Sequence, residues 1–137
     1  MRMGCLLLVF TSACVCEVEV APATAPALVI NEVSTGNPSG DWFEVVNVGD
    51  TPIDLSDLVF VDRPGDFVRA HRMDDVSIAP GAHHIQHVSR EDHGFTLGDA
   101  DALWIHIFDD RALVHHVRWR RGTSRSGASY KRTTRSP

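Results

Sequence analysis

Acidic side chains are concentrated in one short stretch of the sequence, GDWFEVVNVGDTPIDLSDL (40–58). This stretch and the strand-like segment before it contain six acids: Glu32, Asp41, Glu44, Asp50, Asp54 and Asp57. Two carboxylates at a defined separation in a cleft could act as the acid and base of a hydrolase, and several together could bind Ca²⁺. Carboxylates can also hold a fold together by accepting hydrogen bonds from backbone N–H groups.

The alternation of side chains in WFEVVN favours a structural interpretation of Glu44. In an extended strand Phe43 and Val45 share one face, while Trp42, Glu44 and Val46 share the other. Burying a lone carboxylate between apolar neighbours is costly unless hydrogen bonds satisfy it. We therefore expect Glu44 to accept hydrogen bonds from backbone N–H groups of a loop that crosses the edge of the fold.

Local turn chemistry explains the other polar residues of the stretch. Asn47 can close a turn with its side chain, and Asp54 and Ser56 can form Asx-type or Ser-type turns. No sequence feature pairs two carboxylates or a carboxylate with a nucleophile, so we predict no catalytic residue. The oxygen-rich loops at 36–41 and 48–50 could take up Ca²⁺, but they lack the Asp-x-Asp-x-Asp-Gly pattern. No metal or cofactor is therefore predicted.

Histidines form a second group of side chains capable of chemistry. Four of them lie close together in the sequence: His83, His84, His87 and His93. In a strand His83 and His87 would share a face and His84 would lie on the other, so a two-histidine metal site is conceivable. His115 and His116 would point in opposite directions. The sequence has no HExxH pattern, and the preferred interpretation is a partly solvated strand face.

The elements that position these residues are short apolar runs separated by turn residues. No window shows a convincing helical stripe with caps, and the runs are rich in Val, Ile, Trp and Phe. About seven short strands at spacings of about ten residues predict an all-β sandwich. The runs are 28–33, 42–48, 53–62, 67–73, 76–78, 83–88, 103–108 and 112–119.

The segment LVINEV followed by DWFEVVNVGDTPIDLSDLVFVD resembles the lamin tail domain family. The matching positions are Asn31, Glu32, Trp42, Glu44, Asn47, Asp54, Leu55 and Ser56. The later segments SIAPGAHHIQHV, FTLGDADALWIHIFDDRALVHHVRW and ASYKR are similar to the family's later strands, so the resemblance covers about residues 28 to 132. At Asp57 and Leu58 the family usually has Gly and Trp.

This resemblance implies an immunoglobulin-like β-sandwich. The family's fold is an interaction module of nuclear lamins and of exported bacterial proteins, without catalytic activity of its own. It is often joined to hydrolase domains, which leaves a domain associated with a metal-dependent hydrolase as an alternative. The expected partner is a protein or another component of the cell envelope.

The first residues have the order of a secretory signal. Arg2 precedes an apolar run at 3–10 and small residues, and this run is shorter than the roughly 20 residues of a membrane-spanning helix. We predict a signal peptide at 1–13. Ala13-Cys14 resembles a lipoprotein signal, which makes Cys14 a possible lipidation site. The Pro/Ala-rich segment 14–27 then reads as a tether to the sandwich.

The formal charge is distributed unevenly along the chain. Residues 1–110 hold all 18 acids and five basic residues, whereas residues 111–137 hold eight basic residues and no acid. We predict a sandwich at 28–119 and a basic tail at 120–137, with a last edge strand around 128–132. The preferred interpretation is a solvated tail, and the alternative is nucleic-acid or polyanion binding. The residues for that alternative are Arg118, Arg120, Arg121, Arg125, Lys131 and Arg132.

Overall fold

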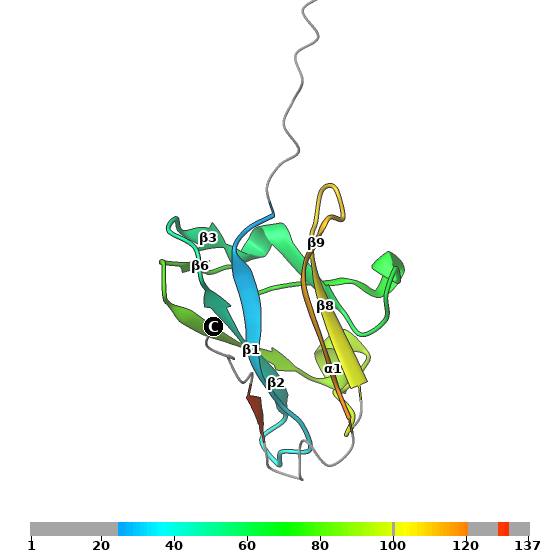
Figure 1. Cartoon of the computed structure of the whole chain (residues 1–137). Helices are drawn as coiled ribbons and strands as arrows, with labels where there is room; N and C mark the ends of the chain where they lie inside the picture. The colour runs from blue at the N-terminus through cyan, green and yellow to red at the C-terminus, as the bar shows by residue number, and fades with distance from the viewer. Residues whose placement is uncertain (1–24, 100, 121–128, 132–137) are drawn as a thin grey trace, which may run out of the picture.

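The structure is a computed structural model that describes residues 25–99, 101–120 and 129–131. These residues form an all-β fold of short antiparallel strands with little helix (Figure 1). The predicted signal and most of the tether lie outside the described residues. The strands are β1 (Leu28–Ser34), β2 (Asp41–Asn47), β3 (Ile53–Asp54), β4 (Leu58–Val61), β5 (His71–Arg72), β6 (Ser77–Ile78), β7 (His83–Val88), β8 (Asp101–Ile107), β9 (Leu113–Trp119) and β10 (Ser129–Lys131).

Three antiparallel sheets arrange these strands. The first has four strands in the order β10-β1-β2-β7, and the second has four in the order β5-β4-β8-β9. The third is the two-stranded pair β3-β6. In β2 the alternation is as the sequence predicts, because Phe43 and Val45 are fully buried while Trp42, Glu44 and Val46 are half-buried.

A single apolar core joins the two larger sheets. Phe43 from β2 meets Phe60 from β4 with 5.3 Å between ring centroids, so the inner faces of the two sheets touch there. Buried Leu55 and Leu97 add to the core from outside the larger sheets. Burial of apolar surface of this kind is the main stabilising contribution to folding.

Short helical segments interrupt two of the predicted runs. The run 53–62 contains a 3₁₀ turn, η1 (Leu55–Asp57), and the first half of the run 67–73 forms a second, η2 (Phe67–Arg69). A further short helix, α1 (Arg90–His93), begins after Ser89, whose hydroxyl accepts a hydrogen bond from the Asp92 N–H. The helix ends at Gly94, whose φ of +74° favours glycine.

Strand β1 has neighbours on both of its edges. A register shift between Ile30 and Glu32 marks a bulge opposite β2, and the Ile30 N–H donates to Nδ1 of His115 in β9 at 3.2 Å. The C-terminal half of β1, residues 32–34, pairs with β10. β1 therefore contacts β9 and β10, which are far from it in the sequence.

Candidate functional site

Asn47 lies at the end of β2 and its side chain holds three chain segments together. Its Oδ1 accepts from the Gly49 N–H at 2.9 Å, and its Nδ2 donates to the carbonyls of Thr51 at 2.8 Å and Ile78 at 3.1 Å. Asn47 is completely buried. Its amide therefore links the turn after β2 to β6, which is a structural task that leaves no polar atom of the side chain for chemistry.

Asp54 and Ser56 form a local cap. The Asp54 Oδ1 accepts from the Ser56 N–H at 3.1 Å and from the Ser56 hydroxyl at 2.8 Å, which begins η1. Between them Leu55 is fully buried in the core. These three matched positions thus set a turn and anchor it.

Glu44 lies on the outer face of the first sheet and contacts the side chains of Asn31 and His83. Its Oε1 accepts from Asn31 Nδ2 at 2.7 Å and lies 3.0 Å from His83 Nδ1. Asn31 is at the bulge of β1 and His83 begins β7, so Glu44 connects all three strands across the face. Glu32, the partner of Glu44 in the β1–β2 register, is half-buried, as is Trp42.

Asp41 accepts backbone hydrogen bonds of the kind that the sequence predicts for Glu44. Its Oδ1 accepts from the Gly36 N–H and its Oδ2 from the Leu97 N–H, both at 2.8 Å. Asp41 is 8% exposed, and the bond to Leu97 spans 56 positions in the sequence. The sequence offers a weak signal for this role, an Asp at the junction of a turn cluster and a strand. Its distant partner Leu97 gives none.

Removing the Glu44 carboxylate should weaken the outer face of the first sheet. We expect Glu44→Ala to lower the free energy of unfolding by about 1–2 kcal/mol, because Asn31 loses a charge-assisted acceptor at a partly solvated site. Urea unfolding followed by circular dichroism measures this change. Glu91→Ala, at an exposed position of α1, is the control and should change stability by less than about 0.5 kcal/mol. Equal stabilities of the two variants would contradict the role of Glu44.

The exposed face of β7 has the alternation expected of its histidines. His83, Ile85 and His87 are exposed, whereas Gln86 and Val88 are buried on the opposite face. His84, on the inner side, lies 2.9 Å from Asp74. His83 and His84 thus contact different carboxylates, those of Glu44 and Asp74. Within the described ranges no group of three or more His, Cys, Asp or Glu residues could hold a metal ion.

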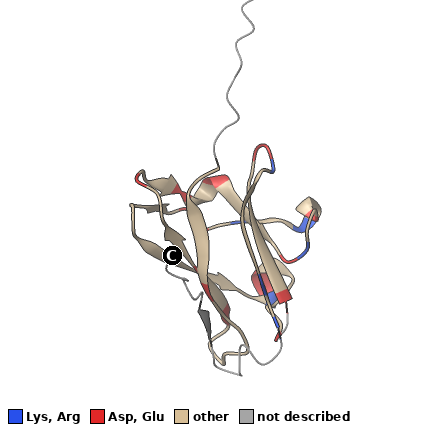
Figure 2. Cartoon of the chain, viewed as in Figure 1, with Lys and Arg blue, Asp and Glu red and all other residues tan. Residues whose placement is uncertain are grey.

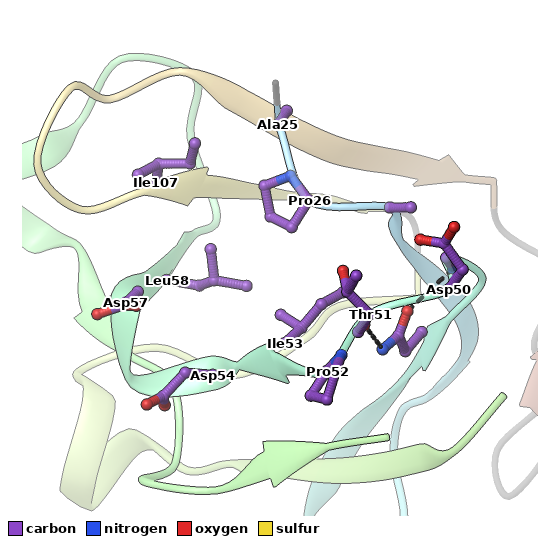
Figure 3. Close-up of a pocket in the computed structure, with 13 residues that line it drawn as sticks. Ala25, Pro26, Asp50, Thr51, Pro52, Ile53, Asp54, Asp57, Leu58 and Ile107 are labelled. Atoms are coloured by element: carbon purple, nitrogen blue, oxygen red, sulfur yellow. Dashed lines mark hydrogen bonds between the residues drawn. The ribbon is translucent and has the colours of Figure 1, made fainter. Parts of the chain in front are cut away.

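A cleft of about 490 Å³ lies where the tether enters the fold (Figure 3). Ala25 and Pro26 form one wall, and the turn after β2 forms the opposite wall. Three acids line this cleft, Asp50 from the turn after β2 and Asp54 and Asp57 from the two ends of η1. The oxygen of Asp54 that caps η1 is already engaged with Ser56, and Thr51 offers its carbonyl to Asn47.

A second cleft, of about 570 Å³, lies between the η2 loop and α1. His71 and His93 are at its base, with 5.0 Å between their ring centroids at an angle of 84°. Both rings lie against the buried ring of Phe60, at 5.9 and 5.3 Å. Burial lowers the pKa of His93 below its ordinary value of 6.5, and the charge of His71 lowers it further.

The lowered pKa of His93 predicts a loss of stability in acid. The unfolded chain binds a proton at His93 more readily than the folded chain, so the stability present above pH 6.5 is lost as the pH falls through the lowered pKa. We expect His93→Gln to flatten the decrease in unfolding free energy between about pH 7 and 5. Urea unfolding at several pH values measures it, with the exposed-residue variant His87→Gln as control. An unchanged slope in His93→Gln would refute the prediction.

The basic residues suggested for polyanion binding are only partly within the described chain. Arg118 is exposed near the end of β9 and lines a shallow hollow with Asp62 and Asp101. Arg120 is exposed just beyond β9, and Lys131 ends β10 at the edge of the other sheet. The other three lie outside the described residues: Arg121, Arg125 and Arg132. Polyanion binding therefore stays a prediction.

Comparison with protein families, with curated proteins and with solved structures gave no match. In the part of the chain that the structure describes, no helix is both long enough and apolar enough to span a membrane.

Proposed function

We propose that the chain is an exported, non-catalytic binding or structural module of the lamin tail type, with an immunoglobulin-like sandwich as its fold. The observation that carries the proposal is that polar side chains of the acidic stretch bind backbone groups of the fold. Asp41, Asn47 and Asp54 each direct their side chains to backbone groups of nearby turns or of a distant loop. Side chains engaged in this way stabilise a scaffold and are poorly placed to act as acids, bases or nucleophiles.

The two four-stranded antiparallel sheets around one core support the sandwich part of the proposal. The leader sequence supports export, since a charged start, an apolar run and small residues precede Cys14. A lipid on Cys14 would hold the module at a membrane surface through the tether 14–27. The module would then present its loops and sheet faces to an envelope partner.

The mass of the mature N-terminus tests the proposed location. The full-length gene product is expressed in a bacterial host and recovered from the membrane and soluble fractions, and each form is measured as intact protein. We expect the chain to begin at Cys14 with a diacylglyceryl group, and Cys14→Ala to move it out of the membrane fraction. A chain that keeps residues 1–13 and stays in the cytoplasm would overturn export and anchoring together.

A further inference from the structure

Between residues 25 and 110 most basic residues lie around one cleft, whereas Arg111, Arg118, Arg120 and Lys131 lie on or beside β9 and β10. Residues 25–110 contain 16 acids and only four basic residues, all arginines: Arg63, Arg69, Arg72 and Arg90. Three of these four line the cleft between the η2 loop and α1, and only Arg72 lies elsewhere. In Figure 2 blue segments mark the η2 region and α1, and further blue marks the β8–β9 turn and the end of β9. Like charges repel, so their convergence on an acidic body indicates an anionic ligand.

Two of the three arginines have no ion partner. Arg69 lies 3.8 Å from Asp66, whereas the guanidinium groups of Arg63 and Arg90 form no hydrogen bond or ion pair with any residue that the structure describes. Both side chains are exposed at the rim of the cleft. An unpaired guanidinium presents a planar set of donors that matches a carboxylate or phosphate.

The base of the cleft adds two imidazoles to these cations. His71 and His93 lie on aromatic rings, with Phe95 5.9 Å from His71 and Phe60 beneath both. His93 Nδ1 accepts the Ser89 N–H at 3.2 Å. Val68, 97% exposed, completes the wall on the η2 loop. The cleft thus combines donors at the rim with an aromatic base.

We propose that this cleft binds an oxyanion, a carboxylate or phosphoryl group, between Arg63 and Arg90 and above His71 and His93. Asp62 and Asp92 also line the cleft, so the three arginines and two aspartates that line it have a net formal charge of +1. One oxygen of Asp92 already accepts from the Ser89 hydroxyl at 2.6 Å. The carboxylate of Asp74 contacts His84 and Gln86 of β7, and its charge partly offsets the lowering of the His93 pKa.

This inference does not depend on export or lipidation, so the N-terminal mass can fail without affecting it.

The test is an NMR titration of the full chain at low salt with sulfate, which stays doubly charged between pH 5.5 and 7.5. We expect saturable shifts of the His71 and His93 ring resonances. The double variant Arg63→Gln/Arg90→Gln should lose about tenfold or more in affinity. Arg72→Gln is the matched control, because Arg72 lies over Phe108 outside the cleft, and it should bind as the wild type does.

Parallel titrations with inorganic phosphate and with succinate identify the source of the oxyanion. Tighter binding of phosphate supports a phosphoryl ligand, and tighter binding of succinate supports a carboxylate ligand. An absence of saturable shifts at His71 and His93 would overturn the proposal. Equal binding by the wild type and the double variant would overturn it as well, since the anion would then lie elsewhere.

Discussion

Asn47→Ala is expected to lower the free energy of unfolding by about 2–4 kcal/mol. The substitution removes a buried amide that satisfies the Gly49 N–H and the carbonyls of Thr51 and Ile78. Each backbone group left without a partner in the interior costs the desolvation that the amide had offset. The turn after β2 and the short β3-β6 sheet should loosen together, because Asn47 is their common link.

Urea unfolding at equilibrium measures the effect, with Asn37→Ala as a matched control. Asn37 lies in the loop before β2, and its amide contacts the Ser34 hydroxyl, so its loss should cost less than about 1 kcal/mol. Asn47→Asp is an informative second variant, since it keeps the shape but directs an oxygen at two carbonyls. It should destabilise at least as much as alanine does. If Asn47→Ala and Asn37→Ala lost equally little stability, Asn47 would not be the link described here.

Asp41→Asn has the second large expected effect, a loss of about 2–3 kcal/mol. The side chain keeps its shape, but an amide nitrogen cannot accept a hydrogen bond. One of the Gly36 and Leu97 N–H groups therefore loses its acceptor, and the other loses the charge of the carboxylate. The loop that carries Leu97 should therefore lose its hydrogen bond to β2, which weakens the packing of Leu97 in the core.

Asp50→Asn is the matched control for this variant. Asp50 is exposed in the turn after β2, and the same chemical change there should alter stability by less than about 0.5 kcal/mol. Urea unfolding gives the two free energies under one set of conditions. If Asp41→Asn were as stable as Asp50→Asn, the carboxylate of Asp41 would be dispensable and open to another role.

Local patterns in the sequence predicted the strands well where alternation is strong. The run 83–88 has the bounds of β7, and the alternation around Phe43 and Val45 fixes which face of β2 meets the core. The prediction of a strand at 67–73 is wrong in its first half, where the structure has η2. There Phe67 packs on His106 outside the core, with 4.9 Å between ring centroids, while Val68 is exposed. α1 is too short to produce a helical period.

Contacts between distant segments could not be predicted in the same way. The turn around Asp54 and Ser56 is local, so residue types and spacing suggest it. The bond from the Leu97 N–H to Asp41 depends on how a loop crosses the end of β2, which no local pattern encodes. The same holds for the gathering of Arg63 and Arg90, which are far apart in sequence and meet only through the fold.

Amide hydrogen exchange at Leu97 tests most directly the central claim that the acidic stretch holds the fold together. The Leu97 N–H lies in a loop, and the partner that the structure gives it is the carboxylate of Asp41. The account predicts that this amide exchanges as slowly as the ladder amides of β2, at a rate set by global unfolding. Exchange at the rate of a freely solvated loop amide would contradict it, and the carboxylates would again be candidates for chemistry.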